Sequence, residues 1–254
     1  MDIAIVTGAS SGMGRQFVLQ AAAMEHYDEI WVIARRKERL EELAQMTKTP
    51  LRILALDLKE PDSLSQIRQI LEEQKPLVRL LVNAAGFGKF GPTAGLSDEE
   101  VSDMVQLNVY ALAVLTRAVL PYMKAGGRII QVASVAAFQP LPDMSIYAAS
   151  KAFVLSFSRA LGRELKRRGV TVTAVCPGWT QTEFFTVAQS TEHPESVRNF
   201  PGMARPADVV RKALRDSAKG KAVSVYGFHN KGHRLLAKLF PHRLVMAVWE
   251  RIKN

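Results

Sequence analysis

The sequence contains one cysteine, Cys176, in 254 residues, so the chain cannot form an internal disulfide or a cysteine-rich metal site. It has no unbroken apolar run of about 18 residues, which argues against a membrane-spanning helix. The N-terminus has neither a basic segment nor a long apolar segment before its first strand pattern, so no secretory signal is expected. The five histidines lack the spacing of a metal site. These absences favour a metal-free protein of the cytoplasm.

Acidic residues are scarce in the last fifth of the chain. Residues 201–254 contain 12 Lys/Arg and 3 Asp/Glu, whereas residues 1–200 contain 22 and 21. The basic character is therefore local. This distribution disfavours a nucleic-acid-binding surface spread over the whole protein, and it favours an anionic partner near the C-terminus.

Short apolar runs alternate with longer helical patterns along most of the chain. Strands are expected at 3–6, 30–34, 51–56, 79–82, 128–133, 171–176 and 222–226, and helices at 13–26, 36–46, 62–74, 98–124, 147–168 and 206–218. The strands are rich in β-branched residues and alternate only weakly, which is typical of strands covered on both faces. The pattern predicts an α/β fold, a single-domain Rossmann-type doubly wound parallel sheet of about seven strands in three α/β/α layers. This domain should span residues 1–228, with an irregular segment at 182–205 as a candidate lid.

A glycine-rich turn, TGASSGMGR at residues 7–15, follows the first expected strand and leads into a helix. Glycines permit a tight turn and let backbone N–H groups approach a pyrophosphate at the positive N-terminus of the helix. The spacing is G-x-x-x-G-x-G rather than the commoner G-x-G-x-x-G. Its position between a strand and a helix nevertheless predicts a dinucleotide-binding turn.

Two arginines, Arg35 and Arg36, follow the second expected strand. Enzymes that prefer NAD usually have an acidic residue here for the ribose 2′-hydroxyl, whereas arginine accommodates a 2′-phosphate. Planar guanidinium groups suit bidentate phosphate contacts, so NADP(H) is the expected cofactor. Alternatively, Arg36 does not contact the cofactor and is a solvent-exposed residue at the start of the helix RKERLEEL.

Tyr147 and Lys151 lie four residues apart in SIYAASKAF, residues 145–153. In a helix, the phenol and the ammonium would lie one turn apart on one face. An unperturbed tyrosine has a pKa of about 10, too high for efficient proton exchange near neutrality. We expect the neighbouring cation to lower the pKa of Tyr147. The same spacing also arises in helices by coincidence, so other motifs must decide whether Tyr147 and Lys151 form a proton-transfer pair.

Further motifs follow the expected strands in a fixed order. They are Asp57-Leu58, NAAG at residues 83–86, Asn108, Ser134 and Pro177-Gly178. With the glycine turn and YAASK, they resemble the short-chain dehydrogenase/reductase family over about residues 1–226. The resemblance implies an NADP(H)-dependent oxidoreductase that interconverts a carbonyl group and an alcohol.

The resemblance also implies a role for each matching residue. Tyr147 would donate the proton to the carbonyl oxygen, and Lys151 would bind the nicotinamide ribose. Ser134 would hold the carbonyl oxygen, an interaction that stabilises developing negative charge, and Asn108 would position a water behind Lys151. The implied cofactor-binding residues are Gly8, Ser10, Gly12, Met13, Gly14, Arg35, Arg36, Asp57, Leu58, Asn83, Ala84, Gly86, Tyr147, Lys151, Pro177, Gly178 and Thr182.

The substrate is expected to be a small-molecule ketone or aldehyde reduced by NADPH, since fold and catalytic residues do not name it further. One alternative is an alcohol or hydroxysteroid dehydrogenase that acts oxidatively. Another is a non-catalytic NADPH-binding regulator, which the intact Ser134, Tyr147 and Lys151 set argues against. The family also implies a homodimer or homotetramer through the helices at 98–124 and 147–168.

Residues 229–254 form a basic extension with two expected helices separated by Pro241. One apolar stripe in the second helix is Leu244, Val245, Val248, Trp249 and Ile252. Such a basic amphipathic extension could lie on an anionic membrane or cover an active site for lipidic substrates. The alternative is packing against the body of the protein or a dimer partner.

Overall fold

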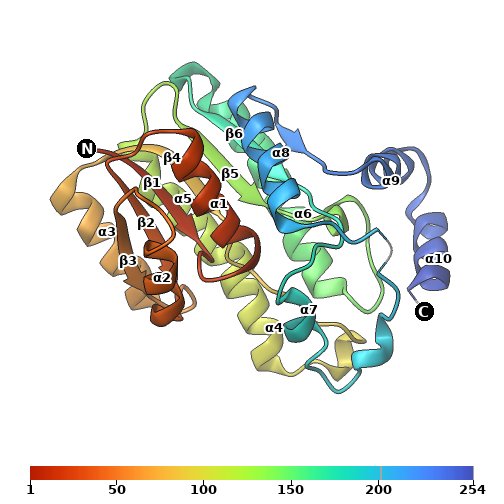
Figure 1. The fold of residues 1–254 in the computed structure, drawn as a ribbon. Coiled ribbons are helices and arrows are strands. Elements are labelled where there is room, and N and C mark those ends of the chain that lie inside the picture. Colours follow the sequence, from red (N-terminus) through yellow and green to blue (C-terminus); the bar gives the residue numbers. More distant parts are fainter. Residues whose placement is uncertain (201, 254) are drawn as a thin grey trace.

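Seven parallel strands form one sheet in the computed structural model, which describes residues 1–200 and 202–253 (Figure 1). The strands are β1 Asp2–Thr7, β2 Glu29–Ala34, β3 Leu51–Ala55, β4 Leu77–Asn83, β5 Arg128–Val132, β6 Thr171–Val175 and β7 Val223–Ser224. Their order is β3-β2-β1-β4-β5-β6-β7. The order in which strands are added to the sheet therefore reverses between β1 and β4. In such sheets, ligands bind beyond the carboxyl ends of the strands at this point. The predicted fold class is confirmed.

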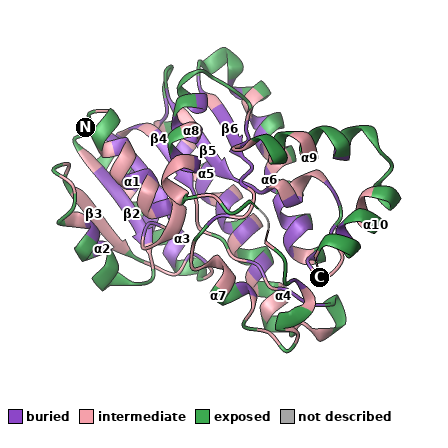
Figure 2. Cartoon of the chain, turned by 45° about the vertical axis from the view of Figure 1, so that its right-hand side comes forward, coloured by how far each residue is buried: buried purple, intermediate pink, exposed green. Residues whose placement is uncertain are grey.

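Helices cover both faces of the sheet because the strand residues point alternately to each side. Ala4 and Val6 pack with α1 Gly12–Met24, α2 Lys37–Ala44 and α8 Pro206–Ala218. Ile3 and Ile5 pack with α3 Pro61–Gln74, α5 Leu112–Val119 and α6 Ser145–Glu164. Figure 2 shows the buried strands between these two helical layers. The remaining short helices are η1 Thr93–Gly95, η3 Leu120–Tyr122, η4 Val135–Phe138 and η5 Leu165–Arg168.

The long helix expected at 98–124 is interrupted in the structure. It begins as α4, Asp98–Val105, continues as a π-helical segment, Gln106–Ala111, and then becomes α5. π-Helical turns occur frequently at functional sites, and this one contains Asn108. By length and composition alone the run Asp98–Tyr122 could cross a membrane, with 39% of its most apolar window buried. Because α5 packs in the core beside the sheet, it also fits the core helix of a folded domain.

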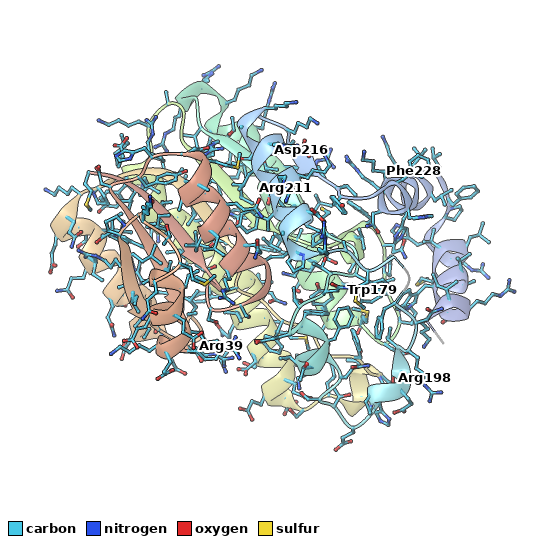
Figure 3. All side chains as sticks on the ribbon, in the orientation of Figure 1. Arg39, Trp179, Arg198, Arg211, Asp216 and Phe228 are labelled. Atoms are coloured by element: carbon cyan, nitrogen blue, oxygen red, sulfur yellow. The ribbon has the colours of Figure 1, made fainter. Side chains whose placement is uncertain are left out.

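Asp216, near the end of α8, connects this helix to the last strand, β7, through hydrogen bonds (Figure 3). Its carboxylate accepts hydrogen bonds from Lys212 Nζ at 2.6 Å, Lys221 Nζ at 2.9 Å and Ser224 Oγ at 2.8 Å. Burial raises the pKa of Asp216, but the bonds from these three groups outweigh burial and lower the pKa to about 2. The ionised carboxylate therefore stabilises the sheet edge that leads into the C-terminal extension.

The expected lid contains two short helices, α7 Phe184–Ala188 and η6 Pro194–Ser196; residue 201 lies outside the described residues. A bridge between Thr180 and Ala204 closes its base. The C-terminal extension forms α9, Phe228–Leu239, and α10, His242–Ile252. The two helices meet at Pro241, as expected, and stand at the edge of the molecule beyond α6 (Figure 1). Their outer surfaces are largely exposed (Figure 2).

Candidate active site

A cavity of about 1380 Å³ lies at the carboxyl ends of the strands. It is lined by nearly all of the predicted site residues: Gly8, Ser10, Gly12, Met13, Gly14, Arg35, Arg36, Asp57, Leu58, Ala84, Gly86, Ser134, Tyr147, Lys151, Pro177, Gly178 and Thr182. The predicted residues that do not line it are Asn83 and Asn108. The topology therefore brings segments far apart in the sequence to one site.

The glycine turn has no room for side chains at two positions. Gly8 has a φ of +66°, and a Cβ atom there would lie 2.8 Å from the backbone nitrogen of Ala85. A Cβ atom on Gly14 would lie 2.1 Å from the carbonyl oxygen of Gly8. Thr7 ties the turn to the neighbouring strand, since its Oγ1 accepts hydrogen bonds from Ala84 and Ala85 N–H. The bare turn at the start of α1 thus fits a dinucleotide pyrophosphate.

Two arginines, Arg35 and Arg36, line the adjacent part of the cavity, and a third, Arg39, lies close to it. Arg36 Nη2 lies 3.2 Å from Ser10 Oγ, and Arg35 Nη1 lies 3.7 Å from Asp57 Oδ2. Arg39 lies one turn beyond Arg36, on α2. This arrangement fits the 2′-phosphate of NADP(H), the anion that planar guanidinium groups bind best.

Glu183 of the lid occupies this cationic site. Its Oε2 accepts a hydrogen bond from Arg36 Nη2 at 2.7 Å, and its Oε1 pairs with Arg39 Nη1. The bond from Arg36 lowers the pKa of Glu183; burial opposes this shift, and Arg39 adds to it. Sequence reasoning missed both Arg39 and Glu183. The i, i+3 spacing of Arg36 and Arg39 could have identified the former, but nothing local identifies Glu183.

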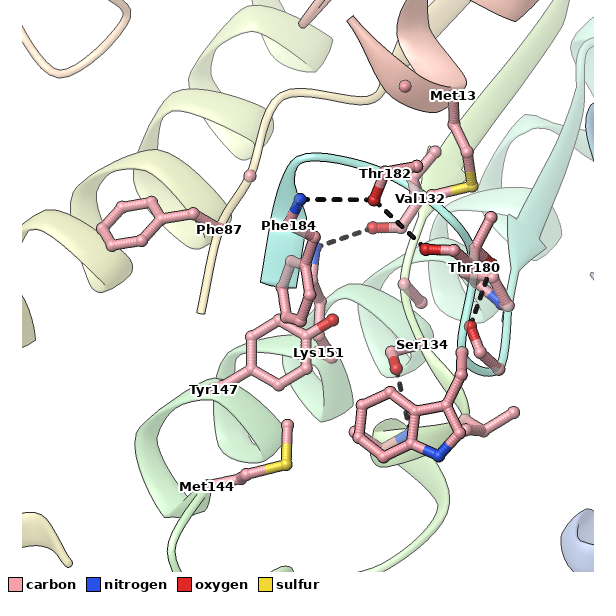
Figure 4. A pocket seen from close by; sticks show the side chains of 18 of the residues that line it. Met13, Phe87, Val132, Ser134, Met144, Tyr147, Lys151, Thr180, Thr182 and Phe184 are labelled. Atoms are coloured by element: carbon pink, nitrogen blue, oxygen red, sulfur yellow. Dashed lines mark hydrogen bonds between the residues drawn. The ribbon is translucent and has the colours of Figure 1, made fainter. Parts of the chain in front are cut away.

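The predicted catalytic side chains are buried and come from two neighbouring elements. Ser134 follows β5, and its Oγ accepts a hydrogen bond from Ala136 N–H at 3.1 Å. Tyr147 and Lys151 lie one turn apart on α6. Lys151 Nζ donates to the Val132 carbonyl at 3.0 Å and lies 5.7 Å from the centre of the Tyr147 ring (Figure 4). Ser134, Tyr147 and Lys151 are 8%, 8% and 4% exposed, so bulk water has little access to them.

The expected lowering of the Tyr147 pKa is not found. Burial raises the pKa of Tyr147 to about 12, although a hydrogen bond from Ser134 partly opposes the shift. Burial likewise lowers the pKa of Lys151 to about 8, because it disfavours the charged amine. The effect of burial on the Tyr147 pKa is therefore larger than the expected stabilisation of its phenolate by the Lys151 ammonium. The phenol is therefore protonated near neutrality, as a proton donor must be.

The two asparagines lie behind the cavity wall. Asn108 Nδ2 donates to the Phe87 carbonyl at 2.8 Å, and its Oδ1 accepts from Phe87 N–H at 3.1 Å. A Cβ atom on Gly86 would lie 2.8 Å from Asn108 Oδ1 and 3.1 Å from Lys151 Nζ. Asn108 thus holds the segment after β4 against Lys151. The prediction for Asn83 needs correction, because its buried amide donates instead to side chains of the core, Thr116 and Gln131.

Aromatic side chains from the lid pack beside Tyr147. The ring of Phe184 lies 5.3 Å from that of Tyr147, centre to centre. Trp179, which follows Pro177-Gly178, lines the cavity, and its ring centre lies 6.4 Å from that of Trp249 in α10. In Figure 4, Phe184 lies directly above Tyr147. The substrate end of the cavity is therefore largely apolar.

The doubly wound sheet, the glycine turn and the buried Ser134, Tyr147 and Lys151 group define an NAD(P)-dependent oxidoreductase. The family model for short chain dehydrogenases matches residues 2–193. Sulfoacetaldehyde reductase 2 of Chromohalobacter salexigens is 37% identical over 197 residues, which cover 73% of this chain and 75% of that protein. The chain belongs to the short-chain dehydrogenase family.

Solved structures of the family match almost the whole chain. A short-chain dehydrogenase from Sphingobium yanoikuyae in complex with NADPH has a TM-score of 0.79 at 28% identity, covering 95% of this chain and 97% of that one. A bulky-bulky ketone specific alcohol dehydrogenase from Comamonas testosteroni has a TM-score of 0.75 at 26% identity, covering 95% of each chain. The likeness extends beyond the residues that the family model matches.

Proposed function

We propose that this protein catalyses the NADPH-dependent reduction of a ketone or aldehyde to an alcohol, with Tyr147 as the proton donor. The observation that carries the proposal is the burial of Ser134, Tyr147 and Lys151 in the same cavity as the glycine turn. The phenol of Tyr147 is protonated near neutrality, which is the state from which a proton donor acts in reduction.

NADP(H) is the cofactor that the cavity fits. The glycine turn would hold its pyrophosphate, while Arg35, Arg36 and Arg39 favour a 2′-phosphate over a bare ribose hydroxyl. Bound NADPH would supply a hydride to the carbonyl carbon. The NADPH complex of the Sphingobium yanoikuyae relative supports this assignment.

The chain's own side chains would handle the proton and the oxygen. Ser134 would donate a hydrogen bond to the substrate oxygen as negative charge develops there. Tyr147 would transfer its phenolic proton to that oxygen, and the charge of Lys151 would stabilise the phenolate that remains. Asn108 would act indirectly, by holding the backbone at Phe87 and the wall around Lys151.

A panel of ketones and aldehydes tests the proposed function through NADPH oxidation at 340 nm. We expect turnover with the wild type and a loss of about 100-fold or more in kcat with Tyr147→Phe, the size typical of lost general acid catalysis. Unchanged thermal stability and NADPH binding of the variant would show that the loss is chemical. Full activity of Tyr147→Phe would refute the proposed mechanism.

We also infer a homodimer or homotetramer formed through α4–α5 and α6. Tyr110 and Phe153 on these helices are 50% and 39% exposed, and Phe153 stacks on Phe157 at 5.7 Å. Exposed aromatic residues on long helices are typical of protein interfaces. Light scattering after size exclusion tests the inference, and a monomer at micromolar concentration would contradict it.

A further inference from the structure

The cavity that contains Tyr147 extends past the catalytic residues to the C-terminal helices. Five large apolar side chains of the C-terminal extension line it, from α9, α10 and the link between them, namely Leu236, Phe240, Leu244, Val248 and Ile252. Each of them is between 48% and 56% exposed. We call these five residues the tail wall. Their shared orientation toward the cavity leaves apolar surface exposed beside the active site, where a ligand could cover it.

The extension that carries the tail wall is attached to the body through both of its helices. In the middle of α9, His233 Nε2 lies 2.5 Å from Gln139 Oε1. In α10, Trp249 is 7% exposed, and its Nε1 donates to the Pro142 carbonyl at 3.0 Å. Four of the five tail-wall residues, Leu236, Phe240, Leu244 and Val248, lie between these two attachments. The segment that carries these four residues is therefore held over the cavity between two fixed points.

The C-terminal end of α10 also contacts the two segments that border the catalytic residues. Lys253 forms an ion pair with Asp143, which precedes α6. Its carbonyl oxygen accepts hydrogen bonds from the N–H groups of Arg198 at 2.7 Å and Asn199 at 3.2 Å, both in the lid. The position of the tail wall is thus fixed relative to Tyr147 and the lid.

The charges that line the cavity lie mainly at the cofactor end. Among the described lining residues, the Lys and Arg side chains are Arg35, Arg36, Lys59, Lys151 and Arg251. The first three lie beside the proposed nucleotide site, and Lys151 is bonded to the Val132 carbonyl. Arg251 is in the last turn of α10, next to Ile252 of the tail wall. The part between Tyr147 and the tail wall is bordered mainly by apolar side chains, including Leu141, Met144 and Phe184, and by the bonded pair of Gln139 and His233.

We propose that the substrate is a ketone or aldehyde with a large apolar body, whose carbonyl lies at Ser134 and Tyr147 and whose body lies along the tail wall. This inference rests on the proposed reduction, and it names the substrate class. Burial of the exposed tail-wall surface would supply binding free energy in proportion to the area covered. A small anionic aldehyde such as sulfoacetaldehyde would leave the tail wall uncovered and would find no cation beside Tyr147 other than Lys151 among the described lining residues.

A homologous series of straight-chain 2-alkanones tests the substrate class, with sulfoacetaldehyde as the small anionic comparison. Each buried methylene contributes about 0.8 kcal/mol, so kcat/KM should rise about fourfold per added carbon until the tail wall is covered. A flat series, or sulfoacetaldehyde as the best substrate, would overturn the inference while leaving the proposed reduction intact. Absence of turnover on every carbonyl compound would instead refute the proposed function.

Adjacent leucines of α9 provide a matched pair of variants. Leu236 lines the cavity and is 53% exposed, whereas Leu235 is 58% exposed and is not among the lining residues. Leu236→Gln should lower kcat/KM for the longest 2-alkanone about tenfold and flatten the chain-length dependence. Leu235→Gln should leave both unchanged, because it alters the outer face. Neither residue is in the core, so both variants should fold normally.

The Leu235→Gln variant, on the outer face of the extension, shows whether the effect is specific to the tail wall. Equal losses in Leu235→Gln and Leu236→Gln would overturn the substrate inference, because the tail wall would then have no special role. If, in addition, Leu235→Gln weakened binding to vesicles of phosphatidylcholine with 30% phosphatidylglycerol, the extension would be a membrane contact. Loss of chain-length dependence in Leu236→Gln alone supports the tail wall as the substrate-binding surface.

Discussion

The ion pairs of Glu183 lead to a quantitative prediction about cofactor choice. This carboxylate binds Arg36 and Arg39, the guanidinium groups that a 2′-phosphate would contact. The 2′-phosphate of NADPH must therefore displace Glu183 from these groups, whereas NADH, which has no 2′-phosphate, need not. Replacing Glu183 with glutamine removes the competing charge while keeping the size of the side chain. We expect Glu183→Gln to bind NADPH more tightly and NADH almost unchanged.

The expected gain follows from the exposure of the two ion pairs. Glu183, Arg36 and Arg39 side chains are 42%, 42% and 45% exposed, so solvent screens each pair substantially. Exposed pairs contribute about 0.2–1 kcal/mol each. Two pairs therefore correspond to a gain of about 0.4–2 kcal/mol, or about 2- to 30-fold in the Kd for NADPH.

Fluorescence titration of the bound nicotinamide measures both dissociation constants directly. Glu42→Gln is the matched control, because Glu42 is an exposed carboxylate on α2 that pairs with neither Arg36 nor Arg39. It removes the same charge, so a general electrostatic effect would appear in both variants. Weaker NADPH binding by Glu183→Gln would refute competition between Glu183 and the 2′-phosphate. It would show instead that Glu183 stabilises the bound cofactor. Equal gains for NADPH and NADH would refute the competition as well.

Three other predictions follow from the burial and packing of single side chains. Because burial lowers the pKa of Lys151 to about 8, its charge is present below that pH, so kcat/KM for reduction should fall above about pH 8; a flat profile from pH 6 to 10 would contradict this. Asp216→Asn should destabilise the protein by about 2 kcal/mol above pH 4, with the difference shrinking as the pH falls toward 2, because the folded pKa is about 2 and the unfolded value is 3.8; denaturant unfolding across this range measures it. Gly14→Ala should weaken NADPH binding at least tenfold and lower the Tm, because its Cβ atom would lie 2.1 Å from the Gly8 carbonyl oxygen; normal affinity and Tm would show that the turn can relax.

The sequence by itself determined the order of strands and helices, the glycine turn and the Tyr147–Lys151 pair. These features depend on short-range spacing: apolar periodicity marks the elements, and a four-residue interval places two side chains on one helix face. The doubly wound topology followed from the repeated strand–helix order, since parallel strands require crossover connections. Within helix α6, the local pattern was therefore sufficient to place both side chains.

Only the tertiary structure decided the direction of Asn83, the sign of the Tyr147 pKa shift and the position of Glu183. Asn83 turned toward Thr116 and Gln131 because packing between β4, β5 and α5 buries its amide there. Glu183 and Arg36 are 147 residues apart in the sequence, and their contact exists only because the lid crosses the nucleotide site. The Tyr147 pKa depends on how completely the assembled fold excludes water, and burial outweighed the nearby cation. Such effects arise from the joint position of many segments, which no local pattern specifies.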